Sequence, residues 1–375
     1  MDVSGALGQL NLGSKPWLGR SASPERLSEL LTGPPAREHW KYTPITRFVD
    51  AFVANCATIA PATLQLEDSD QGGVSVQSFN ELAGDDLAVV RNALEGLDPA
   101  RYPFAELAIL NDAPGYLIKV HGELADPISL NFTSPQQLVL LDVSDNAQVT
   151  LIERSGPSAY ATSTLLRLGR GCRVTHARCA LDAALEHLSL LDVIQAADSS
   201  YDLQQYLVGG DKRRAEVHLV LAEPGAHASV TGAYLTEQGR HLDQQLVVEH
   251  RAPNTRSRQT IHGIGLGTSK SVFNGRIHIH AGASGTDATL SNKNLALGSA
   301  TEIDTKPELE IYTDDVKCAH GATVGQLDNE QIFYLQSRGM PEAQARALLC
   351  SAFVRTCVTG PLAEQVTDRL TRGLR

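Results

Sequence analysis

The segment NAQVT at Asn146–Thr150 returns further along the chain as GCRVT at Gly171–Thr175. Looser echoes begin at Gly225 and at Gly282–Ala283, the last continuing as DAT at Asp287–Thr289. Successive starts are separated by one, two and two units of roughly 27 residues, which is typical of solenoid proteins. The pattern predicts a β-helix, in which each coil buries its apolar face against its neighbours. A β-sandwich or jelly roll, which also contains many short strands, stays open as an alternative.

The predicted secondary structure changes twice along the chain. From about Tyr116 to Val324, short β-rich runs such as LIKVHG, QQLVLLDV and AEVHLVLA are separated by Gly, Asn and Asp turns, as expected of an all-β domain. Before this region, Ser23 caps a predicted helix that has Pro24 at its first position, and a second helix is expected over Asp85–Leu97. After it, an antiparallel pair of helices is predicted.

We therefore predict a mainly β protein with three parts. Residues 1–115 form a mainly helical N-terminal domain, residues 116–327 form the β-helix core, and residues 328–375 form a C-terminal helical domain. In the last part, Asp328 is the expected N-cap of the first helix and Pro341 begins the second. The apolar face of the second helix is expected to contain the following residues: Ala345, Leu348, Leu349, Ala352 and Phe353. Cys350 and Cys357 share a face of the same region, which favours packing or partner contact over chemistry.

Composition excludes several classes of function. The formal net charge of −11 argues against binding to nucleic acid and to anionic membrane surfaces. No run approaches the roughly 20 apolar residues of a membrane span, and the N-terminus does not have the pattern of a signal peptide. The six cysteines are scattered along a long chain, which is not a disulfide framework and fits a reducing cytoplasm.

The clearest candidate site is the Cys-x-His pair of Cys318 and His320. An extended chain places Val316, Cys318 and His320 on one face, because side chains in a strand repeat every two residues. A soft sulfur and an imidazole nitrogen together suit iron, zinc or a persulfide. Two ligands do not complete a tetrahedral site, so the remaining ligands must come from elsewhere. The competing interpretation of Cys318 is a small buried hydrophobe.

Other constellations carry less weight. Cys172, His176 and Cys179 resemble half of a zinc site, but an extended strand does not bring all three to one face. His278 and His280 are interpreted as the polar face of a strand, and His250 as either a turn-stabilising residue or part of a site. The glycine-rich Gly263–Ser271 does not have the spacing of a phosphate-binding loop, so we expect no nucleotide on this chain.

The sequence is similar to one known family along most of its length. The stretch PELEIYTDDVKCAHGATVGQLDNEQIFYLQSRGMP at Pro307–Pro341 resembles the signature of SufD, a scaffold subunit of SUF iron–sulfur cluster assembly. SRQTIHGIGLGTSKSVFNGRI from Ser257, HRAPNTRS from His250, TKPELEI and EHWKYTP agree as well. The sister subunit SufB typically carries a HEAT-like segment where this chain has DVKCAHGAT, so the resemblance favours SufD.

The resemblance implies a fold, partners and a role for the Cys-x-His pair. It implies a right-handed parallel β-helix that pairs with SufB, and C-terminal helices that bind the ATPase SufC. A homodimer is the alternative assembly when SufB is absent. Cys318 and His320 would hold a nascent iron–sulfur cluster or its iron at the SufB interface, with SufB supplying the other ligands. The chain itself would catalyse no reaction. A reduced flavin is associated with the complex as a whole, and no residue here identifies a flavin site.

Two alternatives remain at this point. The first is a carbohydrate-active β-helix enzyme with Asp304, Asp314 and Asp315 as acid and base candidates. The low aromatic content of 5% argues against it, since sugar sites use aromatic stacking. The second is a purely structural partner subunit in which Cys318 and His320 are inert.

Overall fold

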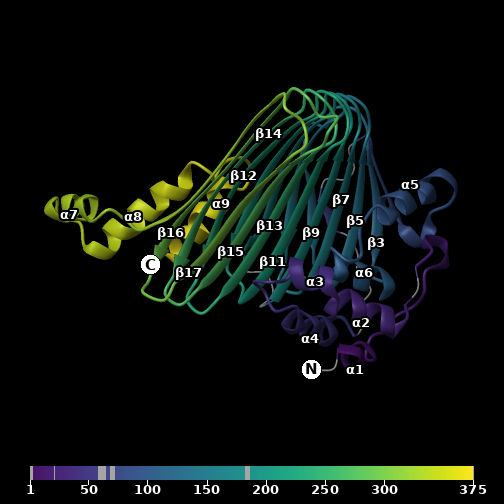
Figure 1. The fold of residues 1–375 in the computed structure, drawn as a ribbon, viewed down its shortest axis with the longest axis horizontal. Coiled ribbons are helices and arrows are strands. Elements are labelled where there is room, and N and C mark those ends of the chain that lie inside the picture. Colours follow the sequence, from purple (N-terminus) through teal and green to yellow (C-terminus); the bar gives the residue numbers. More distant parts are fainter. Residues whose placement is uncertain (1–2, 21, 58–64, 68–71, 182–185, 375) are drawn as a thin grey trace.

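Two parallel sheets dominate the computed structural model, which describes residues 3–20, 22–57, 65–67, 72–181 and 186–374. Figure 1 shows the strands side by side, with helices at both ends of the sequence lying outside them. The β18 sheet contains, in spatial order, β1 (Gln65–Glu67), β4 (Ile128–Phe132), β6 (Gln148–Ser155), β8 (Arg173–Leu181), β10 (Ser200–Val208), β12 (His227–Thr236), β14 (Arg256–Leu266), β16 (Thr286–Leu297) and β18 (Val316–Gly325). The β17 sheet contains β17 (Glu302–Ile311), β15 (Lys270–Ile279), β13 (His241–His250), β11 (Lys212–Leu221), β9 (Glu186–Gln195), β7 (Ala161–Leu168), β5 (Gln136–Val143), β3 (Gly115–Val120) and β2 (Val74–Ser78).

The connectivity is that of a parallel β-helix, which confirms the prediction. Successive strands alternate between the two sheets, and from β3 onward each strand pairs in parallel with the strand one coil later. The coils lengthen along the chain, because the step from Gln148 to its partner Arg173 is shorter than the step from Arg256 to its partner Asp287. Only β1 and β2 pair antiparallel to their neighbours among the described strands. A β-sandwich, whose sheets are antiparallel, is therefore excluded.

A stacked turn explains the repeat in the sequence. One turn position has positive φ in six successive coils, a conformation that Gly, Asn and Asp tolerate best. These residues are Asn146, Gly171, Asp198, Gly225, Asn254 and Gly285. The pairing of Val149 with Val174 confirms the NAQVT and GCRVT alignment. The echo assigned to Gly282–Ala283 was out of register, because the longer turn of the last coils places Gly285 at the position equivalent to Gly225.

The interior of the β-helix is packed, and helices cover part of each outer face. Inward-facing residues such as Leu203, Phe273 and Ile277 form one continuous apolar core between the sheets. The N-terminal helices cover part of the outer face of the β17 sheet, where Phe52 packs against Tyr160. The helices are α1 (Val3–Leu7), α2 (Pro24–Thr32), α3 (Pro34–His39), α4 (Ile45–Cys56), α5 (Gly84–Glu95) and α6 (Pro103–Leu110), with short 3-10 turns at Pro16–Leu18 and Phe79–Glu81. The predicted Ser23 cap is present, because its side chain accepts a hydrogen bond from the Arg26 amide.

The C-terminal part holds three helices rather than the predicted pair. They are α7 (Asn329–Ser337), α8 (Glu342–Arg355) and α9 (Ala363–Gly373). Helix α9 was missed although Leu362, Val366 and Leu370 repeat every four residues and are buried. Helices α8 and α9 pack on the outer face of the β18 sheet, whereas α7 and the start of α8 project away from it (Figure 1).

Helix α8 has two apolar faces, of which the sequence predicted one. Ala345, Leu348, Leu349 and Ala352 share a face by their spacing, and the last three line a groove with α7, where Leu348 is 48% exposed. Cys350 and Val354 lie on the opposite face and pack against the β18 sheet, and Phe353, predicted for the first face, packs with this second group. The expectation that Cys350 and Cys357 serve packing is confirmed, since both lie in the core between α8 and the β18 sheet. All six cysteines are free, so no disulfide framework is present.

Candidate functional site at the open end of the β-helix

The last coil of the β-helix is uncovered. β17 and β18 are each the final strand of their sheet, so one edge of each has no strand beside it within the described chain. The C-terminal helices pack against a sheet face and do not cross this end (Figure 1). As a result, side chains that occupy interior positions reach solvent: Ile311 is 41% exposed although its partner Ile279 is buried, and Val324 is 48% exposed.

Cys318 and His320 belong to this uncovered interior. On β18 they pair with Ala288 and Leu290 of β16, both of which face the core. Cys318 packs partly against that core, and His320, one inward position further along, is exposed. The predicted sharing of one face by Val316, Cys318 and His320 agrees with this register.

The pair consists of a thiol and an imidazole, two groups that can bind a soft metal. Burial, with a smaller contribution from the Asp287 carboxylate, raises the pKa of the Cys318 thiol, so the free chain holds it protonated at neutral pH. Among the described residues, no group of three or more His, Cys, Asp or Glu side chains is arranged to hold a metal ion. Cys318 and His320 are thus two possible metal donors to which the described residues add no third.

The three acidic candidates of the carbohydrate-enzyme alternative do not form one site. Asp304 lies near the start of β17, whereas Asp314 and Asp315 follow its end. The strand from Asp304 to Ile311 spans roughly 23 Å at the usual rise per residue. Paired glycosidase carboxylates stand within about 10 Å. Asp304 instead lies 3.5 Å from Lys270, as part of a surface ion pair.

The Cys172, His176 and Cys179 constellation is structural. Cys172 is buried in the interior of the β-helix, while Cys179 lies on the opposite side of the sheet under the C-terminal helices. His176 is buried inside, with Nδ1 2.8 Å from the Tyr201 hydroxyl and Nε2 3.4 Å from Glu153. This arrangement agrees with the prediction that the three side chains do not converge on a metal.

The structure also places the remaining histidines. His250 is fully buried and bonds Thr255 and Ser257, each at 2.8 Å, which settles it as a turn-stabilising residue. His278 and His280 stack with ring centroids 4.0 Å apart on the outer face of the β17 sheet, as predicted for a polar strand face.

Sequence reasoning missed a cluster of buried charge beside these histidines. His218 lies between Asp192 and Glu249, at 2.8 and 3.0 Å. Burial opposes protonation of His218, but the hydrogen bonds to the two carboxylates outweigh it and raise its pKa. The three residues stand on successive strands of one sheet, so each is about one coil from the next in the sequence. Charged residues and histidines that recur at the coil length are therefore the sequence feature that could have predicted this cluster.

Together the stacked parallel coils, the terminal helices and the uncovered last coil define a β-helix protein with two flanking helical regions. A family model described as SUF system FeS cluster assembly, SufBD core domain, matches residues 130–353. The chain belongs to this family and is SufD-like.

Proteins similar to this chain are found in several organisms, and two of those described here carry names that refer to iron–sulfur cluster assembly. The iron–sulfur cluster assembly protein SufD of Escherichia coli is 29% identical over 389 aligned residues, which cover 89% of this chain and 88% of that protein. An iron–sulfur cluster assembly SufBD family protein of Mycobacterium leprae is 28% identical and covers 89% of this chain and 87% of its own length. A chloroplastic protein of Arabidopsis thaliana, ABCI7, is 28% identical over 64% of this chain. No helix in the described part of this chain is long and apolar enough to cross a membrane.

Proposed function

We propose that this chain is a non-catalytic scaffold subunit that helps to assemble and transfer nascent iron–sulfur clusters together with SufB and the ATPase SufC. The observation that carries the proposal is the uncovered last coil, where Cys318 and His320 stand among apolar interior residues that reach solvent. Unpaired strand edges favour pairing with another strand. A SufB chain stacked on this end would continue the core and complete the ligand set around the pair. A second copy of this chain could pair there when SufB is absent.

The proposed SufC contact lies on the projecting C-terminal helices. Phe333 and Tyr334 of α7 are 71% and 57% exposed, and Leu348 of α8 lies beside them in one shallow apolar groove. Exposed apolar groups concentrated in one groove are typical of a protein-binding surface. The family membership supports an ATPase as the occupant, because this chain lacks a phosphate-binding loop of its own.

The test is co-expression with SufB and SufC and isolation of the complex without oxygen, followed by measurement of iron and sulfide. We expect His320→Ala and Cys318→Ala to leave the complex intact and to lower its cluster content. His227→Ala, which removes an exposed histidine from β12, is the matched control and keeps full content.

Three outcomes separate the interpretations. An intact complex with reduced cluster supports a ligand role for the pair. An intact complex whose cluster content is unchanged in the variants supports the alternative that this chain is a purely structural partner subunit. Failure to form a complex with either SufB or SufC contradicts the proposed scaffold function.

A further inference from the structure

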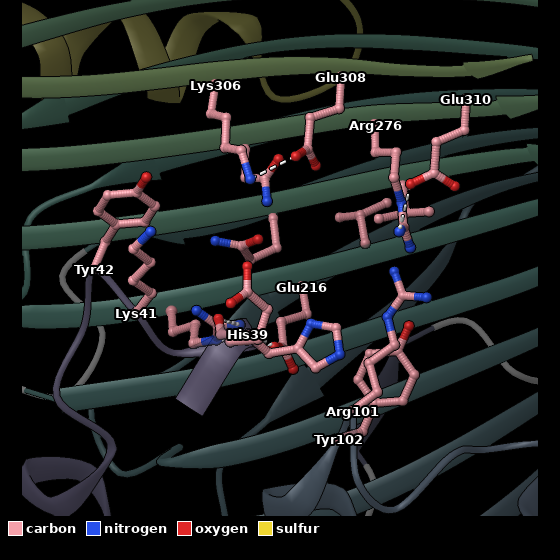
Figure 2. Close-up of a pocket in the computed structure, with 16 residues that line it drawn as sticks. His39, Lys41, Tyr42, Arg101, Tyr102, Glu216, Arg276, Lys306, Glu308 and Glu310 are labelled. Carbon is pink, nitrogen blue, oxygen red and sulfur yellow. Dashed lines mark hydrogen bonds and ion pairs between the residues drawn. The ribbon is translucent and has the colours of Figure 1, made fainter. Parts of the chain in front are cut away.

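A cavity lies between the N-terminal helices and the outer face of the β17 sheet, and it extends across that face to β17, the last strand. Its volume is about 240 Å³. His39, at the end of α3, and Arg101 and Tyr102, just before α6, form one wall. Figure 2 shows these residues facing Arg276 and Glu310, which project from the sheet on the other side. No residue of β18 lines it, so this groove is separate from the Cys318 and His320 pair.

Buried contacts hold the two walls together. The Arg214 guanidinium, on β11, is paired with Asp243 and Glu216. It also donates a hydrogen bond to the His39 carbonyl at 3.1 Å and lies over the Trp40 ring at 4.0 Å. A side chain that bonds both the sheet and the helical region fixes the shape of the groove before any ligand arrives, and this preorganisation lowers the entropic cost of binding.

Polar groups in the groove lack partners. The Tyr102 side chain lines the cavity, the residue is only 5% exposed, and its hydroxyl has no hydrogen-bond partner in the described structure. The Oδ1 atom of Asn274, on β15, is likewise buried and unpartnered among the described residues. A buried hydroxyl without a partner costs free energy that a ligand oxygen would recover. These atoms therefore mark where a polar ligand fits.

The uncommitted charge in the groove is positive. Most of its carboxylates already have a cation: the pairs are Glu216 with Arg214, Glu308 with Lys306, and Glu310 with Arg276. Two lining cations, Arg101 and Lys41, form no ion pair with a described carboxylate. Among the lining acids only Glu38 forms no ion pair with a described cation, so the unpaired groups carry a net positive charge. Burial and then the three arginines of the groove lower the pKa of His39, which is the effect of a positive local potential.

We propose that this groove binds a small oxyanion, a molecule bearing carboxylate or phosphate groups, with Arg101 as its charge partner and the Tyr102 hydroxyl as a second donor. A guanidinium presents a planar fork that matches the paired oxygens of either group. The volume lies below the roughly 300–1,000 Å³ of drug-sized sites, which favours a ligand of few atoms over a nucleotide.

Titration calorimetry on the full chain, with citrate and pyrophosphate as separate probes, tests the proposal. We expect at least one probe to bind wild type, with affinity at least about tenfold weaker in Arg101→Gln, since a hydrogen bond to a charged group contributes roughly a factor of ten or more. Tyr102→Phe keeps the ring and removes only the unpartnered hydroxyl, and we expect a smaller loss. Arg170→Gln, at an exposed arginine outside the groove, is the matched control and binds as wild type.

The histidine of the groove gives a second readout. A bound anion next to His39 stabilises its imidazolium, so the midpoint of its NMR titration should rise when the ligand is added to wild type and stay in place in Arg101→Gln. Binding of citrate alone identifies a carboxylate ligand, and binding of pyrophosphate alone identifies a phosphate ligand. The proposal is overturned if neither probe binds at millimolar concentration, or if Arg101→Gln and Tyr102→Phe both bind as tightly as wild type.

Discussion

Acidification should destabilise this protein through His250, and the effect can be isolated with one substitution. His250 is fully buried at the end of β13, and burial lowers its pKa to about 4 from the usual 6.5. In the unfolded chain it titrates at about 6.5. A group with a lowered folded pKa binds fewer protons when folded, so stability is present above pH 6.5 and is lost as the pH falls toward 4.

The magnitude follows from the two pKa values. At pH 7.5 the imidazole is neutral in both states and contributes almost nothing. At pH 5 the unfolded chain has bound its proton and the folded chain has not, which costs about 2 kcal/mol by linkage. Below pH 4 the cost levels off at about 3 kcal/mol, since each tenfold change in proton affinity corresponds to about 1.4 kcal/mol.

Urea unfolding at pH 7.5 and pH 5 measures this effect. His250→Gln retains a side chain that can bond Thr255 or Ser257 but does not titrate. We expect the variant to be less stable than wild type at pH 7.5, and this gap to narrow by about 2 kcal/mol at pH 5, because only wild type loses the His250 contribution. Other histidines titrate equally in both proteins and cancel. A gap of the same size at both pH values would refute the lowered pKa.

Three further predictions concern packing, turns and the C-terminal surface. Burial would raise the pKa of Glu153, but Arg178 and His176 lower it to about 2, so Arg178→Met leaves a buried carboxylate without its main cation. We expect this variant to lose about 3–5 kcal/mol of the free energy of unfolding, measured in urea. A loss under about 1 kcal/mol would contradict the argument. Asn254 has a φ of 58°, so Asn254→Ala should cost about 1 kcal/mol and Asn254→Gly clearly less; equal effects of the two in thermal unfolding would count against the turn argument. Phe333→Ser with Leu348→Ser should change the free energy of unfolding by less than about 0.5 kcal/mol, because both side chains are exposed, and should abolish co-purification with SufC; retained binding would move the contact elsewhere.

The fold was predictable to the extent that backbone conformation constrains residue type. The stacked turn needs a positive φ, and that need selects Gly, Asn or Asp at Asn146, Gly171 and Gly225. Interior columns carry no comparable constraint, because any side chain of suitable volume packs there and polar pairs such as Glu153 with Arg178 also occur. The echo predicted at Gly282–Ala283 lies out of register for a related reason: an insertion in a surface turn changes coil length without disturbing the ladder.

The sequence was enough to predict which side chains of the candidate site share a strand face, but not where that strand lies in the β-helix. The spacing of Cys318 and His320 was enough to place both side chains on one face of a strand. That this strand is the last of its sheet depends on where the chain leaves the stack, which local pattern does not record. The groove at Arg101 and Tyr102 had no signal at all, since its walls come from residues that are far apart in the sequence.

The protonation of Cys318 links the proposed site to assembly with a partner. A thiol whose pKa is raised by burial is a weak ligand in the free chain, because metals bind the thiolate. Stacking of another chain on β18 would bury Cys318 further, which raises its pKa more, unless the partner also brings a cation or iron to the same place. A metal at the interface reverses that balance and deprotonates the thiol. On the proposed function, the chain alone should therefore hold iron poorly, and the complex should hold it well. The complex should lose iron as the pH falls, and because one of its protonatable ligands is then missing, the Cys318→Ala complex should show a weaker dependence of iron binding on pH than wild type.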